Sequence, residues 1–220
     1  MAEAARDTSR PAAWRDARRW RAWLVFMLVF YVTFFPVYVA AGHIAASSGR
    51  AVELFVAWER DIPLIPWMIW PYLSLYPVFL LPLLHMTPGQ MSVLTWQSAV
   101  SVLIAGVVFV LIPGRLGFSP TPVTGMLTPL FDLMTAVDTP HNLVPSLHVT
   151  FAALILLGCA ERASRPPAWI YRLWLAVMCA STVFVHQHHL LDVATGLGLA
   201  AAVRRVLPLD EAHDLAVGGQ

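Results

Sequence analysis

Residues 23–41 read WLVFMLVFYVTFFPVYVAA, a run of 19 residues without a charged side chain. A helix of about 20 apolar residues crosses the hydrocarbon core of a bilayer. The run follows an arginine-rich leader, residues 1–22, as a membrane anchor often does. A cleaved secretory signal is the alternative, because the Ala-Ala pairs at 40–41 and 45–46 resemble cleavage sites. The apolar core of such a signal spans only about 7–15 residues, so the run predicts an anchor.

The composition of the whole chain supports a membrane protein. Of its 220 residues, 58% are hydrophobic and only 12% are charged, whereas a typical soluble domain carries about 25% charged residues. The net charge of +1 gives no indication of a nucleic-acid partner. We therefore expect an all-α polytopic membrane protein whose surroundings are the bilayer.

Five more apolar stretches follow the first one. Together they predict six transmembrane helices, at about 23–41, 62–84, 91–112, 146–160, 168–185 and 188–207. The chain then divides into a cytoplasmic basic leader (1–22), a catalytic membrane domain (23–207) and a cytoplasmic tail (208–220). The second stretch contains five prolines. Each interior proline removes a backbone hydrogen bond and bends the helix, which a packed bundle tolerates.

The arginines are divided unequally between the two ends of these stretches. The leader holds six of them, and Arg162, Arg165, Arg204 and Arg205 fall on the same side as the leader. Only Arg50, Arg60 and Arg115 fall on the other side. Arginine-rich segments stay in the cytoplasm. We therefore expect the connections 42–61, 113–145 and 186–187 to lie on the outer, periplasmic side of the inner membrane.

The connection 113–145 is the longest in the chain, and loops of this length are uncommon without a function. Five apolar residues within it fall on one face at helical spacing: Met126, Leu127, Leu130, Phe131 and Met134. This pattern predicts an amphipathic helix at the outer membrane interface. A helix that merely packs over the bundle as a lid remains the alternative.

Ionisable groups converge on the outer side, where such groups in a membrane bundle mark functional sites. Arg115 follows the third stretch, Ser146 and His148 open the fourth, and His188 and Asp192 open the sixth. His188 and Asp192 are four residues apart and share one helix face. The carboxylate can therefore accept the Nδ1 proton of His188 and leave Nε2 free as a nucleophile.

The other three groups suit a phosphate. Ser146 and His148 lie in the first turn of a predicted helix, where free backbone N–H groups and the helix dipole favour an anion. A guanidinium such as that of Arg115 binds phosphate oxygens in a bidentate manner. His189 is a further candidate for the phosphate site, with a packed histidine as the alternative.

The motif 145-PSLH-148, followed by 188-HHLLD-192, resembles the type 2 phosphatidic acid phosphatase superfamily. The resemblance implies a six-span helical core with its site on one membrane face. It implies that His188 forms a phosphohistidine, that Asp192 orients it, and that His148 protonates the leaving oxygen and later activates the acceptor. It assigns Arg115 and Ser146 to the phosphate oxygens, and it implies no metal and no cofactor.

The resemblance covers about residues 115–198, and the chain departs from it in two motifs. The first motif usually has two basic residues, of which only Arg115 is present, and the Ser-Arg of the third motif reads Ser181-Thr182. Two of three expected phosphate-binding cations are therefore missing. A dianionic phosphate monoester would be poorly compensated in a dry site, whereas a phosphodiester carries only one negative charge.

The two motifs also resemble the inositol phosphorylceramide and sphingomyelin synthase branch, whose enzymes move a phospho-headgroup from a phospholipid to a lipid alcohol. We therefore expect a lipid phosphotransferase acting on a phospholipid or lipid phosphate. A lipid phosphate phosphatase is the alternative, because water can replace the alcohol in the same mechanism.

Two alternatives of other classes remain. A zinc-dependent intramembrane hydrolase would use His148, His186, His188 and Asp192, which are suitable zinc ligand types. A non-enzymatic lipid transporter would use the polar groups as a path for a headgroup, but it would not need the pairing of His188 with Asp192.

Overall fold

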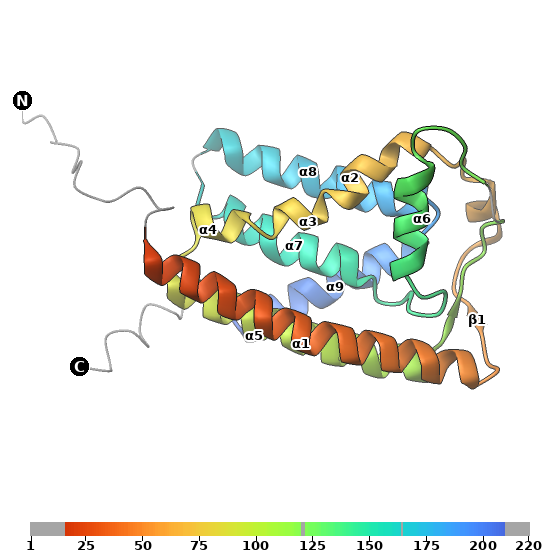
Figure 1. The fold of residues 1–220 in the computed structure, drawn as a ribbon, viewed down its shortest axis with the longest axis horizontal. Coiled ribbons are helices and arrows are strands. Elements are labelled where there is room, and N and C mark those ends of the chain that lie inside the picture. The colour runs from red at the N-terminus through yellow and green to blue at the C-terminus, as the bar shows by residue number, and fades with distance from the viewer. Residues whose placement is uncertain (1–15, 120–121, 164, 210–220) are drawn as a thin grey trace, which may run out of the picture.

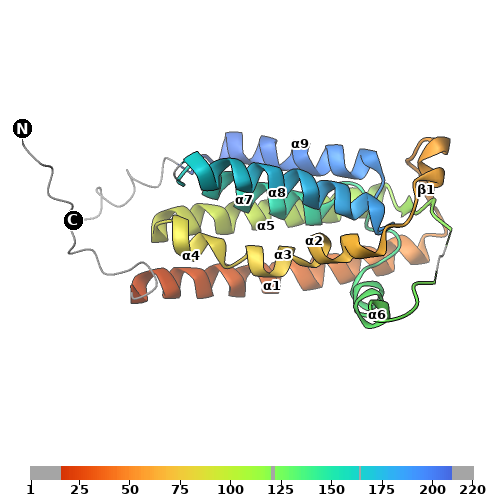
Figure 2. The ribbon, with the colours of Figure 1, turned by 90° about the horizontal axis from the view of Figure 1, so that it is seen from above.

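The structure, a computed structural model, describes residues 16–119, 122–163 and 165–209. In these residues helices dominate, and the long ones run side by side along one axis (Figures 1 and 2). They are α1 (Ala17–Ser47), α5 (Pro88–Leu111), α7 (Leu147–Ala160), α8 (Arg165–Phe184) and α9 (Leu190–Val206). The predicted helical class is confirmed for this part of the chain. Most of the predicted leader and tail lies outside the described residues, and α1 already begins at Ala17.

Three of these helices are long and apolar enough to cross a membrane: α1, α5 and the part of α8 from Pro167 to Phe184. The predicted count of six spans is not confirmed. One reason is length, since the 14 residues of α7 extend only about 21 Å, less than the roughly 30 Å of a hydrocarbon core. The helices nevertheless indicate a membrane protein.

The second predicted span, 62–84, is not one bent helix. It consists of four short helical pieces: η3 (Pro66–Met68), α2 (Ile69–Leu73), α3 (Leu75–Val78) and α4 (Leu81–His85). Its prolines interrupt the backbone hydrogen bonds. Side chains replace some of these bonds, since the Trp23 indole donates to the Phe79 carbonyl (2.8 Å) and the Ser74 hydroxyl donates to the Pro71 carbonyl (2.6 Å).

Helix α7 forms the centre of the fold. Twelve of its 14 residues are buried. Phe151 of α7 meets Phe30 of α1 edge to face at 4.9 Å, and Phe30 in turn contacts Phe79, which follows α3, at 4.8 Å. Aromatic pairs in such arrangements add to the energy of apolar burial. The first turn of α7, which carries His148, is therefore held by a rigid aromatic core.

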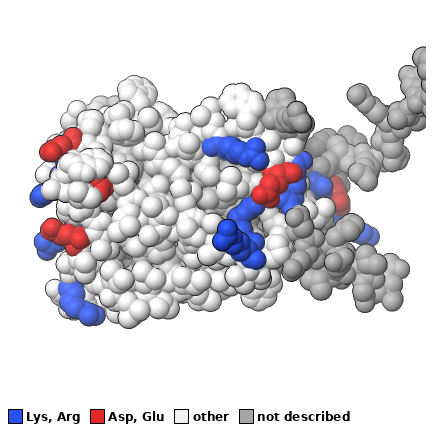
Figure 3. Space-filling view, turned by 180° about the vertical axis from the view of Figure 1, so that it is seen from behind, with Lys and Arg blue, Asp and Glu red and all other residues white. Residues whose placement is uncertain are grey.

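The outer surface has the charge distribution expected of a bilayer protein. On the face shown in Figure 3, charged side chains gather towards the two ends, and a broad uncharged zone lies between them. Large apolar side chains are exposed on several helices, including Leu28 of α1 (64%), Val107 of α5 (60%) and Trp169 of α8 (57%). Apolar surface of this extent requires a partner or a membrane.

The two ends of the bundle differ as the sequence predicted. The start of α1, the piece α4 and the ends of α7 and α9 lie together at one end (Figure 1). There Arg204 pairs with Glu161, and the Arg19 guanidinium donates to the Leu83 carbonyl. The predicted outer connections lie at the opposite end. Which side of a membrane each end faces stays a prediction.

Short elements close the end opposite those arginines. The strand β1 (Val52–Glu53) pairs in parallel with β2 (Gly114–Arg115), with Val52 opposite Gly114. The 3-10 helix η2 (Ala57–Asp61) follows β1. This two-stranded pairing ties the connection after α1 to the connection after α5.

The predicted helix in the long connection is confirmed as α6 (Thr128–Val137), which lies across the end of the bundle (Figure 1). Leu127 and Met134 are buried against α2 and the end of α8, and Leu130 and Phe131 pack beside them. Met126 lies outside the helix and is 77% exposed. The apolar face therefore covers the bundle as a lid, which was the alternative; a position at a membrane interface stays a prediction.

Candidate active site

The first turns of α7 and α9 are joined directly, and this junction positions the site. The Ser146 backbone N–H donates to the Asp192 carbonyl (3.1 Å), and the Thr150 hydroxyl donates to the Gly196 carbonyl (3.1 Å). A Cβ on Gly196 would come within 2.6 Å of the Ser146 carbonyl oxygen, so only glycine permits this close approach. The motifs at 145–148 and 188–192 are therefore adjacent in space.

His188 and Asp192 form the contact that their spacing predicts. The Nδ1 of His188 lies 3.2 Å from Oδ2 of Asp192, which is 1% exposed. The same oxygen accepts the backbone N–H of His189 (2.8 Å). Because a carboxylate only accepts hydrogen bonds, it favours a proton on Nδ1 and leaves Nε2 with its lone pair. No described residue bonds to Nε2 of His188.

The turn before α9 fixes the backbone of His188. His186 adopts a left-handed conformation (φ 60°), which reverses the chain after α8. The N–H groups of Gln187 and His188 then both donate to the Thr182 carbonyl at 3.0 Å. Thr182 stands where the resembling family has an arginine, and here its backbone oxygen holds the segment before His188.

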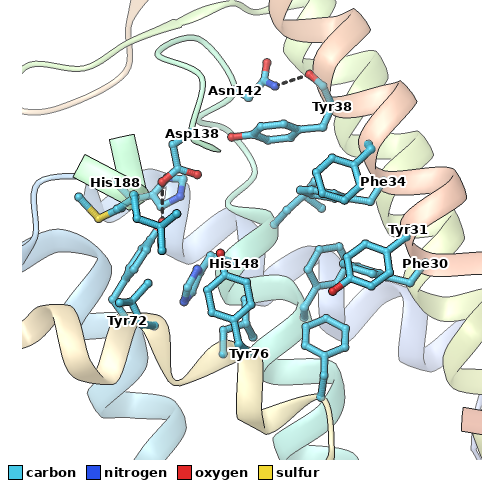
Figure 4. A pocket seen from close by; sticks show the side chains of 18 of the residues that line it. Phe30, Tyr31, Phe34, Tyr38, Tyr72, Tyr76, Asp138, Asn142, His148 and His188 are labelled. Carbon is cyan, nitrogen blue, oxygen red and sulfur yellow. Dashed lines mark hydrogen bonds between the residues drawn. The ribbon is translucent and has the colours of Figure 1, made fainter. Parts of the chain in front are cut away.

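A cavity of about 210 Å³ lies between α1, the α2–α3 pieces and α7, beneath α6 (Figure 4). His148 and His188 both line it. The rest of its lining is mostly aromatic: Phe30, Tyr31, Phe34, Phe35, Tyr38, Tyr72, Tyr76, Phe79 and Phe151. Tyr31 and Phe35 of α1 and Tyr76 of α3 are 44%, 48% and 59% exposed. The cavity therefore reaches the apolar outer surface between α1 and α3.

A second cavity of about 220 Å³ adjoins the first. The two share four lining residues: Tyr38, Asp138, Asn142 and His188. The second is more polar, since Thr135, Thr139 and Gln187 also line it. His188 thus lies where an aromatic cavity meets a polar one, an arrangement that suits a ligand with an apolar body and a polar head.

His148 is held flat against Tyr72. The two rings stack with centroids 4.1 Å apart, and Nε2 of His148 is buried without a hydrogen-bond partner among the described residues. A buried polar atom left unpaired costs free energy. Nε2 of His148 is therefore left for a partner that the described residues do not supply.

Asp138, at the end of α6, is a site residue that the sequence analysis missed. Its Oδ2 accepts the Tyr72 hydroxyl (2.8 Å), and its side chain points towards the same space as His188 (Figure 4). Burial raises the pKa of the Asp138 carboxyl, while the Tyr72 hydroxyl and the nearby His188 act in the opposite direction. No motif marks Asp138. The only sequence signal is an acidic residue directly after an apolar helix face.

His189 lines neither cavity. Its Nε2 accepts the Gly117 N–H (2.9 Å), its Nδ1 lies 3.3 Å from Glu59 Oε2, and its ring lies between Phe55 (4.4 Å) and Phe118 (4.3 Å). A nitrogen that accepts a backbone N–H carries no proton, so the ring is neutral. A neutral, enclosed ring cannot supply positive charge to a phosphate. The structure therefore favours the alternative of a packed histidine.

Glu59 is a second residue that sequence reasoning did not find. It is 1% exposed, its Oε2 accepts the Leu190 N–H at the start of α9 (2.8 Å), and its Oε1 accepts the Val56 N–H (2.9 Å). A carboxylate at a helix N-terminus satisfies free N–H groups and complements the dipole. Glu59 and His189 thus tie the connection after α1 to the start of α9.

Arg115 and Ser146 are not brought to the two cavities. The Arg115 side chain on β2 is 62% exposed and lies 3.7 Å from Glu53. The Ser146 hydroxyl is fully buried and accepts the Val149 N–H (3.3 Å), as the cap of α7. The phosphate contacts predicted for these side chains stay predictions.

The ligands of the zinc alternative do not form one cluster. The His186 ring stacks on Phe118 at 4.0 Å, and its Nε2 lies 2.9 Å from the Ile62 carbonyl. Within residues 16–119, 122–163 and 165–209, no group of three or more His, Cys, Asp and Glu side chains is placed to hold a metal ion.

No protein-family model, no curated protein and no solved structure matches the chain. The resemblance to the phosphatase superfamily therefore rests on the two motifs and their spacing.

Proposed function

We propose that the protein is an integral-membrane enzyme that transfers phosphoryl groups between lipids through a phosphohistidine on His188. The observation that carries this proposal is the His188 ring, held at Nδ1 by Asp192, with Nε2 unpaired where the two cavities meet. Covalent catalysis requires this combination of a nucleophile, an orienting partner and an open reacting atom.

In the first half-reaction, Nε2 of His188 attacks the phosphorus of a lipid phosphate ester. The N–P bond forms, the P–O bond to the leaving alcohol breaks, and His148 gives its proton to the leaving oxygen. Asp192 stabilises the positive charge that develops on the His188 ring. Free N–H groups in the first turn of α7 donate to the phosphate oxygens.

In the second half-reaction, the acceptor hydroxyl attacks the phosphohistidine. Its proton passes to His148, the N–P bond breaks, and the enzyme returns to its starting state. With a lipid alcohol as the acceptor the reaction is a headgroup transfer, and with water it is a hydrolysis.

The linings of the cavities favour a phospholipid as the donor. Among the described residues that line either cavity there is no arginine or lysine. A monoanionic phosphodiester needs less positive charge than a dianionic monoester. The aromatic cavity offers an apolar surface to the glycerol and acyl part of a lipid, and its opening between α1 and α3 gives a route from the bilayer.

The proposal includes an arrangement in the membrane. The series α2–α4 and the helices α7 and α9 complete six crossings with α1, α5 and α8, with both termini in the cytoplasm and the site on the outer side of the inner membrane. A cysteine at position 126, in place of the exposed Met126, should react with an impermeant reagent added outside intact cells. Reaction only after permeabilisation would show the opposite orientation.

The reaction class is tested on the purified protein with labelled phospholipids, with and without diacylglycerol or ceramide as acceptor. Label appearing in the acceptor supports transfer, and label appearing only in a water-soluble phosphate ester shows hydrolysis. Vanadate should inhibit either reaction and a chelator should not. Activity that survives in His188→Ala or is lost with the chelator would refute the phosphohistidine mechanism.

A further inference from the structure

Asp138 is the one formally charged residue among the described residues that line the two cavities, apart from histidines. We infer that Asp138 determines substrate specificity: its carboxylate disfavours a phosphate dianion beside His188 and so restricts the enzyme to phosphodiester monoanions. This inference rests on the proposed function and names the substrate class of that site.

Three hydrogen bonds hold Asp138 and the residue after it in place. The Asp138 backbone N–H donates to the Met134 carbonyl at the end of α6 (3.1 Å), and Oδ2 accepts the Tyr72 hydroxyl (2.8 Å). The next residue, Thr139, donates its N–H to the Tyr38 hydroxyl on α1 (3.4 Å). Figure 4 shows the hydrogen bond from Tyr72 to this carboxylate, and Asp138 and His188 both line the two cavities.

Tyr72 links Asp138 to the second histidine. Its ring stacks on His148 at 4.1 Å while its hydroxyl donates to Asp138. The hydroxyl occupies one carboxylate oxygen, and the other has no hydrogen-bond partner among the described residues. A phosphate bound between His148 and His188 would therefore share the cavity with a carboxylate that has only one described hydrogen-bond donor.

The electrostatic consequence depends on the charge of the phosphate. In a diester reaction, both the bound donor and the phosphohistidine that follows carry one negative charge. In a monoester reaction, the bound donor and the phosphohistidine each carry about two negative charges at a pH above the second phosphate pKa, which is about 6. Like charges repel strongly where little water screens them. For an added unit charge about 10 Å from the carboxylate, an effective dielectric constant of about 20 gives a discrimination on the order of tenfold.

The negative charge of Asp138 and the absence of arginines from the cavity linings therefore have separate effects on phosphate binding. The absence of cations removes stabilisation from every phosphate, whereas a carboxylate penalises the second negative charge in particular. A residue that served only to hold the end of α6 would need the hydrogen bond to Tyr72 but not the negative charge. The two roles are separable by substitution.

The experiment compares wild type with Asp138→Asn, which keeps an oxygen for the Tyr72 hydroxyl and removes the charge. The matched control is Asp132→Asn, an exposed carboxylate on the same helix that lines neither cavity. Each purified protein is assayed at pH 8 with a phosphodiester lipid and with the phosphate monoester lipid that has the same acyl chains. The readout is the ratio of kcat/KM for the monoester to kcat/KM for the diester.

We expect Asp138→Asn to raise this ratio by about tenfold and Asp132→Asn to leave it unchanged. A ratio in Asp138→Asn equal to that of wild type would overturn the inference while leaving the proposed function intact. Absence of a phosphoenzyme in wild type with either lipid would instead refute the proposed function.

Tyr72→Phe provides a second variant in case Asp138→Asn does not fold. It keeps the ring that stacks on His148 and leaves the carboxylate in place without its donor. Because loss of the donor raises the pKa of Asp138 further, the variant is assayed on the alkaline side, where its substrate preference no longer changes with pH. There the inference predicts that the preference for the diester persists. Loss of the preference in Tyr72→Phe would show that the hydrogen bond, and not the charge, sets specificity.

Discussion

His188 and His189 are neighbours in the chain, and each has a buried carboxylate at Nδ1, yet the structure gives them opposite surroundings. Asp192 lies 3.2 Å from His188, and Glu59 lies 3.3 Å from His189. The difference is at Nε2, which accepts the Gly117 N–H in His189 but has no described partner in His188. A carboxylate beside a histidine therefore does not by itself identify a nucleophile. A nucleophile also needs an unpaired second nitrogen, and of the two only His188 has one among the described residues.

The largest expected effect separates the two histidines. His188→Ala should abolish both the phosphoenzyme and the activity and leave the folded protein intact, because it removes the attacking atom. His189→Ala should still form a phosphoenzyme in the fraction that folds. Radiolabel incorporation per folded molecule measures both variants. Loss of labelling in folded His189→Ala, with labelling retained in His188→Ala, would reverse the two assignments.

The second effect concerns the carboxylate of the nucleophile. Asp192→Asn keeps the shape but loses the charge that holds the Nδ1 proton and stabilises the imidazolium. We expect a loss of about 10⁴-fold in kcat, which is the magnitude known for the corresponding aspartate of the serine-protease triad. Steady-state kinetics measures it. A loss below tenfold would mean that Asp192 mainly caps α9 through the His189 N–H.

The third effect should fall on stability. Glu59→Ala leaves the N–H groups of Leu190 and Val56 without their acceptor, which costs about 1–3 kcal/mol for a buried donor. Thermal unfolding in detergent should show a lower Tm, whereas kcat per folded molecule should change far less than in Asp192→Asn. A large fall in kcat at an unchanged Tm would show that Glu59 takes part in the reaction, and it would contradict the proposed difference between the two carboxylates.

The smallest effect is a pH dependence of substrate preference. Burial raises the pKa of Asp138, and the charge is lost as the pH falls through that raised value. The ionisable groups that face Asp138 are Tyr38, Tyr72, Tyr76 and His188. Acidification should therefore raise the monoester-to-diester ratio more in wild type than in Asp138→Asn, where only protonation of the monoester itself contributes. Parallel pH profiles for the two proteins would contradict this assignment.

The sequence predicted those parts of the site that depend on local spacing. The four-residue separation of His188 and Asp192 is sufficient for their contact on one turn, and the apolar face at 126–134 is sufficient to predict a helix. The apolar stretch at 146–160 also placed the start of α7 within one residue. These features need no knowledge of the rest of the fold.

The parts that the sequence missed depend on contacts between distant segments. Glu59 meets Leu190 across 131 positions of the chain, and Tyr72 meets Asp138 across 66. No local pattern encodes such pairs. Arg115 was expected at the phosphate because it is basic, falls on the outer side and matches a basic residue of the resembling family, but β2 places it beside Glu53. The five prolines predicted a bent helix at 62–84, but the structure has separate short pieces there. These pieces depend on hydrogen bonds from side chains such as that of Trp23, which the local sequence does not reveal.

The most direct test of the central claim is to map the phosphoenzyme in His148→Ala with an aryl phosphodiester. An aryl leaving group needs no proton from His148, so His188 should still be modified, and the intermediate should accumulate because no base activates the acceptor. Mass spectrometry should then find an acid-labile, base-stable adduct on His188, and the adduct should be absent when His188→Ala is added. An adduct on another residue, or none at all while substrate is still consumed, would contradict the account.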